Sequence, residues 1–310
     1  MAKLAAVFPG QGSQVVGMGK ALADSFPVAK ATFEEADDVL GFSISKLCFE
    51  GPEDELVKTE NTQPALLTVS IAAFRVMRSE GFEPEAAAGH SLGEYSALVA
   101  ADAIDFAEAL RTVRLRGELM EAAVPKGQGT MAAVLGLDDE AVEALCAESA
   151  GIVRPATYNA PGQVVVAGET AAVLDMMERA RARGARRVQQ LNVSGPFHSP
   201  LLTGAGEALG KRLAEIAFRP PAIPVYSNVT ARPVSSVEEI KDNLARQVYA
   251  PVRWVETIEN MASDGIDSYV EVGPGRVLAG LIKRIDKGAR LMGVESPETL
   301  KAWKEAGDKE

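Results

Sequence analysis

One serine in this sequence stands in a setting typical of a catalytic nucleophile. Ser91 is the centre of GHSLG (89–93), a G-x-S-x-G pattern between a strand expected over 86–89 and a helix expected through Leu98. Small flanking residues permit the tight, strained turn that exposes a serine hydroxyl. The pattern alone is weak because glycine and serine are common, so its weight comes from the strand-turn-helix context. The sequence therefore predicts nucleophilic chemistry at Ser91.

A nucleophilic serine needs a base, and the chain has only two histidines. His90 adjoins Ser91, and adjacent side chains at a strand end point apart, so it is a poor partner. The other histidine, His198 in GPFHS (195–199), is therefore the expected base. No carboxylate after it stands out as the third member of a triad.

Two backbone segments are candidates for binding a developing oxyanion. The Leu92 amide lies at the start of the helix after Ser91, where a helix N-terminus favours negative charge. The segment FPGQGSQ (8–14) follows a strand expected over 4–8, and its glycines allow close approach to a ligand, although an ordinary loop is the alternative. A G-x-G-x-x-A match at 127–132 precedes a strand and not a helix, so we reject a dinucleotide site.

Three arginines lie on one expected helix whose apolar stripe runs from Phe106 to Met120. Arg111 points away from that stripe, whereas Arg114 and Arg116 border it on opposite sides. The periodicity therefore does not choose between Arg114 and Arg116 as a buried cation, and solvated surface arginines are the simpler interpretation.

Composition narrows the class of protein. The chain has 310 residues, 47% of them hydrophobic and 24% charged, and its net charge of −11 disfavours nucleic acid or an anionic membrane as a partner. We expect no signal peptide and no membrane span. Cys48 and Cys146 lack the number and spacing of a disulfide framework or a metal site, so we expect two buried thiols in a reducing cytosol.

Strands and helices alternate along most of the chain, which favours an α/β class with a mostly parallel sheet. Residues 125–195 differ, because their order of elements is β-α-β-β-α-β, the pattern of a ferredoxin-like domain. We expect this small domain to be inserted into a large one made of 1–124 and 196–310. Strands are expected over 4–8, 86–89, 130–135, 152–158, 163–167, 187–193, 225–228, 269–272 and 291–294, with a turn at 159–162 and helices over 138–148, 169–183, 199–216, 237–248 and 252–262.

The motifs together resemble the bacterial malonyl-coenzyme A:acyl carrier protein transacylases of type II fatty-acid synthesis. The resemblance covers nearly the whole chain and lies in several long, ordered motifs. They are FPGQGSQ (8–14), NTQPAL (61–66), GHSLGEYSALVA (89–100), RLRGELM (114–120), NAPGQVVVAG (159–168), GPFHS (195–199), Gln247 within RQVYAPVRW, and EVGPGRVLAGLIKR (271–284).

The resemblance implies a role for each matching residue. Ser91 would be the acylated nucleophile, His198 its base, and the amides of Gln11 and Leu92 the oxyanion hole. Arg116 would bind the malonyl carboxylate as a bidentate ion pair. The remaining implied positions are Gln247, whose backbone carbonyl would orient the histidine, and the substrate-binding residues Gln63, Asn159 and Phe197, the last selecting malonyl over methylmalonyl units. The implied fold is a hydrolase-like α/β domain with the ferredoxin-like insertion.

The implied reaction is ping-pong acyl transfer in the cytoplasm. Malonyl-CoA would acylate the serine, and the phosphopantetheine thiol of acyl carrier protein would then take the malonyl group, with no metal or redox cofactor. Because the carrier protein and this chain are both acidic, docking needs a local basic patch, for which Lys283 and Arg284 are candidates. Other basic candidates are Arg181, Arg183, Arg186 and Arg187. Alternatives are a serine thioesterase or esterase, an acyltransferase of a polyketide pathway, and a non-catalytic carrier-binding module.

Overall fold

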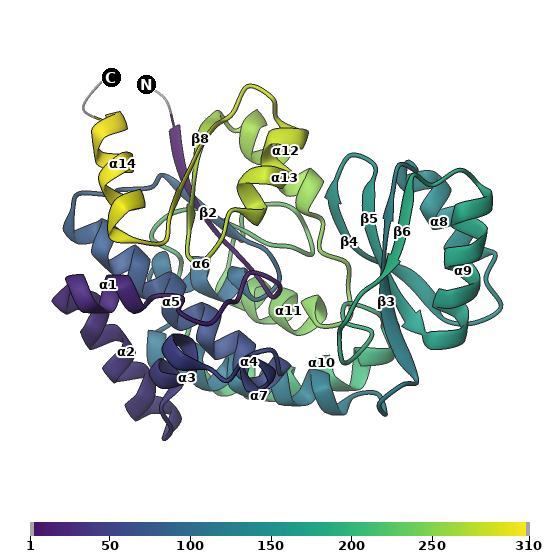
Figure 1. The fold of residues 1–310 in the computed structure, drawn as a ribbon, viewed down its shortest axis with the longest axis horizontal. Coiled ribbons are helices and arrows are strands. Elements are labelled where there is room, and N and C mark those ends of the chain that lie inside the picture. Colours follow the sequence, from purple (N-terminus) through teal and green to yellow (C-terminus); the bar gives the residue numbers. More distant parts are fainter. Residues whose placement is uncertain (1–2, 308–310) are drawn as a thin grey trace.

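The protein is built around two separate β-sheets, which Figure 1 shows side by side. The structure, a computed structural model, describes residues 3–307, so the outermost ends of the expected segments 1–124 and 196–310 lie outside the described residues. The first described strand and the last described helix lie at the same edge of the larger part (Figure 1). The expected α/β class is confirmed as a mixed α/β fold with one parallel and one antiparallel sheet.

The larger sheet is parallel throughout and has the strand order β7-β2-β1-β8-β9. Its strands are β1 (Lys3–Phe8), β2 (Ala86–Gly89), β7 (Val225–Tyr226), β8 (Ile266–Val272) and β9 (Arg290–Val294). Side chains along β1 alternate between its two faces, as strand geometry requires. Ala6 and Phe8 join the main core, whereas Ala5 and Val7 join a second core on the other face. Both faces of the sheet are therefore covered.

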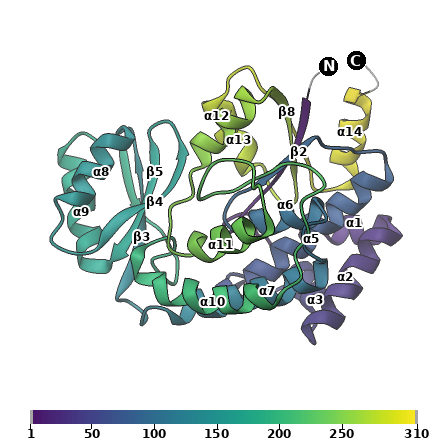
Figure 2. The same cartoon turned by 180° about the vertical axis from the view of Figure 1, so that it is seen from behind.

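Helices form the layer on each face. The second core is closed by α12 (Trp254–Ser263) and α13 (Val277–Ile285). The main core lies under helices that contribute buried residues from both halves of the chain, and α10 packs on α7 and α11 there (Figure 2). They are α1 (Lys20–Ser25), α2 (Pro27–Leu40), α3 (Ile44–Glu50), α4 (Glu53–Leu56), α5 (Thr59–Ser79), α6 (Gly93–Ala100), α7 (Phe106–Ala122), the 3₁₀ turn η1 (Pro200–Leu202), α10 (Thr203–Glu215), α11 (Val237–Gln247) and α14 (Pro297–Gly307).

The smaller sheet is antiparallel, with the strand order β4-β5-β3-β6. Its strands are β3 (Gly129–Leu135), β4 (Val153–Ala160), β5 (Gln163–Glu169) and β6 (Arg187–Gln190). The helices α8 (Asp139–Ala147) and α9 (Thr170–Ala182) cover one face and form a third core with it. Met131 and Val165, on the opposite face, belong to the main core instead, so this sheet packs directly against the larger part.

Several expected boundaries differ from the structure. The expected turn at 159–162 is shorter, because Asn159 and Ala160 are the last residues of β4. The strand expected over 187–193 ends at Gln190, and the one over 225–228 ends at Tyr226. The helices α1 to α4 and α14 carried no expectation. Cys48 and Cys146 are free and buried, as expected.

The turn after β2 depends on two close backbone approaches. A Cβ added to Gly89 would lie 2.0 Å from the backbone of Gly93, and a Cβ added to Gly93 would lie 2.1 Å from the carbonyl oxygen of Phe8. Real Cβ atoms do not reach such distances, so only glycine fits at both positions. The close packing at these two glycines holds the first turn of α6 against the ends of β1 and β2, and this fixes the position of Ser91.

We predict that Gly89→Ala lowers the free energy of unfolding by about 1–3 kcal/mol or more, because the added methyl group overlaps backbone atoms that cannot move separately. The control is Gly280→Ala inside α13, where an added Cβ meets nothing within 4 Å. It should stabilise the protein by about 0.5–1 kcal/mol, the usual gain of alanine over glycine in a helix. Urea unfolding measures both, and equal effects of the two variants would contradict the packing argument.

Candidate active site

The candidate residues meet at the carboxyl ends of three neighbouring parallel strands. Gln11 follows β1, Ser91 follows β2 and Asn228 follows β7. In open α/β sheets, ligands bind in the crevice outside these strand ends. His198 and Arg116 reach the same place from the segment after β6 and from α7. The strand order of the sheet and the packing of α7 therefore bring together residues that are far apart in sequence.

Ser91 and His198 form a hydrogen-bonded pair. The serine Oγ lies 2.8 Å from His198 Nε2. Both residues have a positive φ, 51° for Ser91 and 59° for His198, a conformation that residues other than glycine rarely adopt. Such strain persists only where the surroundings fix it, and it is common at functional sites.

The second ring nitrogen of His198 faces a backbone carbonyl and not a carboxylate. Nδ1 lies 2.7 Å from the carbonyl oxygen of Gln247, which only accepts, so Nδ1 carries the hydrogen and Nε2 is free to accept from Ser91. Burial, followed by the charge of Arg116, lowers the pKa of His198 to about 3. His198 is therefore a neutral base at physiological pH.

Arg116 is the buried cation of the site. Its side chain is 1% exposed, and its NH2 donates to Ser91 Oγ (3.1 Å) and to Gln247 Oε1 (2.9 Å). Its NH1 donates to Gln63 Oε1 (2.7 Å), while its Nε has no partner among the described residues. Arg114, which periodicity could not separate from Arg116, is half-buried, donates to Asn61 and pairs with Glu118.

Two further residues of the site escaped the sequence analysis. Asn228 accepts the Ser91 amide on its Oδ1 (2.6 Å) and donates to the Gly89 carbonyl (2.7 Å), so it holds both sides of the nucleophile turn. Glu94 is 2% exposed and accepts from Asn228 and Gln247. The only signal for Glu94 was its place three residues after the serine.

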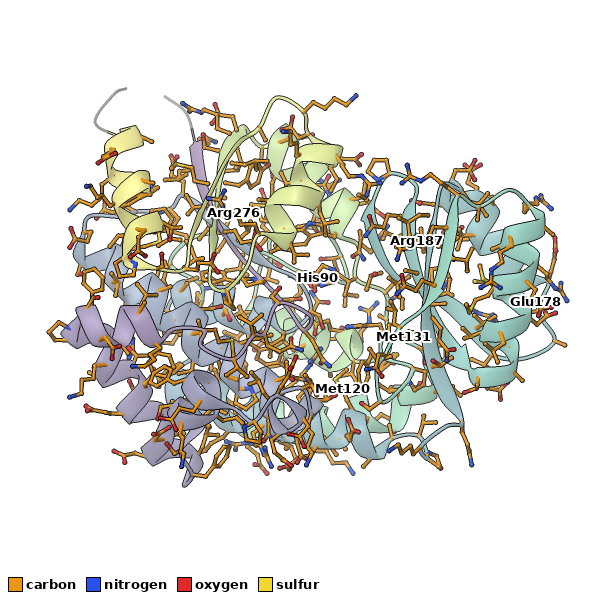
Figure 3. All side chains as sticks on the ribbon, in the orientation of Figure 1. His90, Met120, Met131, Glu178, Arg187 and Arg276 are labelled. Carbon is orange, nitrogen blue, oxygen red and sulfur yellow. The ribbon has the colours of Figure 1, made fainter. Side chains whose placement is uncertain are left out.

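A cavity of about 190 Å³ opens at the Ser91–His198 pair. It brings together most of the expected site residues, namely Gln11, Ser91, Leu92, Arg116, Asn159, Phe197 and His198. Gln63 and Gln247 lie behind the cavity, against Arg116. Met120 and Met131 line it from the two parts of the molecule, and Figure 3 shows them with His90 where the two parts face each other.

The histidine beside Ser91 has another partner. His90 Nε2 lies 2.8 Å from Asn159 Oδ1, and the ring lies 5.6 Å from that of Trp254. The expectation that His90 does not pair with Ser91 is confirmed. Its contact instead joins the nucleophile turn to β4 of the smaller sheet.

The oxyanion candidates differ in their surroundings. Leu92 is buried at the N-terminal end of α6, and within residues 3–307 its amide has no hydrogen-bond partner. The neighbouring amide of Ser91 is occupied by Asn228. Gln11 is exposed at the mouth of the cavity, and its side chain reaches Thr59 Oγ1 at 3.5 Å.

The expected docking residues lie outside the cavity. Lys283 and Arg284 are exposed at the end of α13. Arg284 donates to the Pro161 carbonyl (2.8 Å) and to Gln163, so it already joins α13 to the turn between β4 and β5.

Residues 3–307 contain no group of three or more His, Cys, Asp or Glu side chains arranged to hold a metal ion. None of the helices in that range is both long enough and apolar enough to cross a membrane.

Comparisons with known proteins place the chain among acyl transferases. The family described as acyl transferase domain matches residues 6–300. A malonyl CoA-acyl carrier protein transacylase of Bacillus subtilis (strain 168) is 46% identical, covering 97% of this chain and 96% of the relative. The protein of that name from Escherichia coli (strain K12) is also 46% identical, covering 97% and 99%.

Solved structures of malonyltransferases are also similar to this chain. An acyl carrier protein S-malonyltransferase from Vibrio cholerae superposes with a TM-score of 0.95 at 47% identity, covering 97% of this chain and all of that one. A malonyl-transacylase in complex with its type II PKS acyl-carrier protein gives 0.96 at 47% identity, covering 98% and 100%.

We predict that Ser91 reacts with an uncharged sulfonyl fluoride at a rate that does not fall between pH 8 and about pH 5, because His198, with a pKa of about 3, stays neutral. Protonation of His198 removes the acceptor for the serine proton, so the decline belongs near pH 3. Rapid mixing into the assay buffer, with intact-mass detection, measures the rate without prolonged acid exposure. A decline centred near pH 6.5, the ordinary histidine value, would contradict the role of burial.

Proposed function

The chain belongs to the malonyl CoA-acyl carrier protein transacylases, which are acyltransferases, and on this premise we propose how its residues carry out the transfer. The enzyme moves the malonyl group from malonyl-CoA to the phosphopantetheine thiol of acyl carrier protein and so supplies fatty-acid synthesis. The observation that carries the mechanism is the contact of one serine oxygen with both a neutral histidine and a buried guanidinium.

In the first half-reaction, Ser91 Oγ attacks the thioester carbonyl while His198 Nε2 takes the hydroxyl proton. Negative charge moves to the carbonyl oxygen, where the amides of Leu92 and Gln11 donate to it. Collapse of this intermediate breaks the carbon–sulfur bond, and His198 returns the proton to the leaving coenzyme A thiolate. The Gln247 carbonyl keeps the imidazole oriented throughout, in place of a triad carboxylate.

The second half-reaction reverses these roles. His198 takes the proton of the phosphopantetheine thiol, the sulfur attacks the malonyl-serine ester, and the proton returns to Ser91 Oγ. No residue of this scheme needs a metal or a redox cofactor, and phosphopantetheine comes with the partner protein. We place the reaction in the cytoplasm.

Arg116 selects the acyl group in this proposal. A guanidinium matches a carboxylate with two parallel hydrogen bonds, and the Arg116 Nε is unpartnered beside the cavity. Gln63 holds the opposite side of the fork. The buried ring of Phe197 lines the cavity near Ser91, where it would exclude the branch of a methylmalonyl group. Asn159 would bind the substrate from β4.

We also propose that residues 125–195 form a ferredoxin-like domain inserted between 1–124 and 196–310. The β-α-β-β-α-β order of elements and the strand order β4-β5-β3-β6 support the assignment.

Lys283 and Arg284 remain the proposed docking residues for the carrier protein. Because Arg284 joins α13 to the β4–β5 turn, changing it would also disturb the packing of the two parts. Lys283→Glu is therefore the cleaner probe of docking, with the basic residues at 181, 183, 186 and 187 as the alternative patch.

We predict that Ser91→Ala takes no malonyl label from malonyl-CoA while keeping the unfolding midpoint of the parent protein, because only one hydroxyl is lost. On the unmutated enzyme, intact mass should show one malonyl group that persists in water and leaves when carrier protein is added. Rapid loss to water would indicate a thioesterase, and no label would indicate a binding module. A malonyl adduct on Ser91→Ala would overturn the nucleophile assignment.

We predict that Arg116→Ala lowers kcat/KM for malonyl thioester roughly 30- to 5,000-fold, the cost of about 2–5 kcal/mol for removing one partner of a buried charge pair. Acetyl transfer should fall much less, because acetyl has no carboxylate to leave unpaired. Arg116→Lys should recover part of the malonyl activity, since a point charge cannot form the fork. Arg114→Ala, on the same helix but outside the cavity lining, is the control. Equal losses for malonyl and acetyl in Arg116→Ala would show that Arg116 does not read the carboxylate.

A further inference from the structure

Glu94 is a buried carboxylate that the mechanism above does not use. It lies on α6, three residues after the nucleophile, and is 2% exposed. One of its oxygens accepts from the Asn228 amide (3.0 Å) and from Gln247 Nε2 (2.6 Å). A charged group so deeply buried is costly unless it is paired, so its partners need an explanation.

Those two partners hold the whole reacting group. Asn228 binds the Ser91 amide, while the carbonyl of Gln247 binds His198 and its side-chain oxygen binds Arg116. The carboxylate of Glu94 therefore contacts both residues that position the nucleophile turn, the base and the cation.

The side-chain amide of Gln247 bridges Glu94 and Arg116 through two hydrogen bonds. A carboxylate only accepts, so Gln247 must turn its NH2 toward Glu94 and its oxygen toward Arg116. No ion pair joins Arg116 to a carboxylate directly within residues 3–307. Tyr95 and Glu94 are the acidic groups that act on Arg116 electrostatically, and burial raises the pKa of Tyr95, so only Glu94 can carry a charge near neutral pH.

We propose that Glu94 is a positioning residue and the resident counter-charge of Arg116, and that the carboxylate of an arriving malonyl group displaces it from that role. The inference rests on the proposed function. With malonyl bound, two carboxylates share one buried guanidinium, and like charges in such a site do not both stay ionised. Glu94 therefore takes up one proton from solvent as malonyl-serine forms. The thioester exchange itself is proton-neutral, because the serine proton leaves on the coenzyme A thiol.

Glu94 is poised to titrate at neutral pH. Burial raises its pKa to about 7, against the hydrogen bonds from Asn228, Gln247 and Ser227 and the charge of Arg116. The elements packed against α6 are β1, β2, β7, α5 and α7. Apart from Arg116 and Tyr95, their charged or titratable side chains have other partners: Lys3 and Tyr226 with Asp264, Glu60 with Arg114, Arg75 with Glu35, Arg78 with Phe82, Arg111 with Glu108, Arg114 with Glu118, and Glu121 with Ser194.

The experiment compares malonyl and acetyl thioesters between about pH 6 and about pH 8. As the pH rises, Glu94 ionises and competes for Arg116, so kcat/KM for malonyl should fall about 5- to 10-fold, with about tenfold as the limit over this range for one group whose pKa is about 7. The acetyl value should stay level, because acetyl has no charge to compete with. His198, with a pKa of about 3, is silent in this range.

Glu94→Gln keeps an acceptor oxygen for Asn228 and Gln247 and removes the charge. In this variant kcat/KM for malonyl thioester should no longer depend on pH between about pH 6 and about pH 8. Its value at about pH 8 should rise toward its value at about pH 6. Glu271→Gln is the matched control, because Glu271 is also buried with a pKa raised to about 7 but accepts from the backbone amides of Leu278 and Ala279. It should leave the malonyl profile unchanged.

A second readout needs no variant. With a pH indicator at about pH 7.5, acylation of the unmutated enzyme by malonyl-CoA should take up a fraction of a proton that acylation by acetyl-CoA does not. The proposal would be overturned by equal proton uptake with both thioesters. It would also be overturned if kcat/KM for acetyl fell with pH as it does for malonyl, or if the fall for malonyl persisted in Glu94→Gln. If malonyl labels Ser91 but these signatures are missing, only the role of Glu94 fails. If no label forms on Ser91, the proposed function fails as well.

Discussion

The arrangement of this site depends on a guanidinium buried next to a neutral serine. Arg116 is almost fully excluded from water, yet among residues 3–307 it contacts amide oxygens and a hydroxyl and no carboxylate. Amide oxygens accept hydrogens from its NH1 and NH2 groups without neutralising its charge. The site therefore keeps a positive potential at Ser91 that Glu94 offsets only in part, and this potential favours an acyl group with its own negative charge.

The same potential shapes the base. Burial and the nearby guanidinium both lower the pKa of His198, so the imidazole is neutral whenever substrate arrives. The protein supplies orientation through the Gln247 carbonyl and location through the strained backbone at Ser91 and His198. These contacts come from segments after β2, after β6 and at the end of α11, so the site forms only when the larger fold has closed around it.

The sequence predicted those parts of the site whose chemistry is visible in residue type and local context. Ser91 stood in a recognisable turn, and His198 was one of two histidines. Periodicity could not separate Arg114 from Arg116, because both border the same apolar stripe and only the position of α5 against α7 decides which one is buried. Glu94 and Asn228 gave almost no signal, since their contacts cross more than a hundred residues. The helices between residues 20 and 56 were missed because their short apolar repeats gain stability mainly from packing on one another and on α5.

A backbone carbonyl beside His198, in place of the carboxylate of a serine protease triad, follows from the same charge. A carboxylate at the Gln247 carbonyl position would lie next to His198, on the residue whose side chain contacts Arg116. Its negative charge would raise the pKa of the histidine, and its attraction to the nearby guanidinium would offset part of the positive charge that the substrate meets. A carbonyl fixes the imidazole without adding charge. Glu94, set one amide further away, can balance Arg116 in the empty site and still yield to a stronger, direct partner. A carboxylate beside His198 would weaken the attraction of Arg116 for the substrate, whereas Glu94, which acts through the Gln247 amide, leaves Arg116 able to bind the substrate carboxylate.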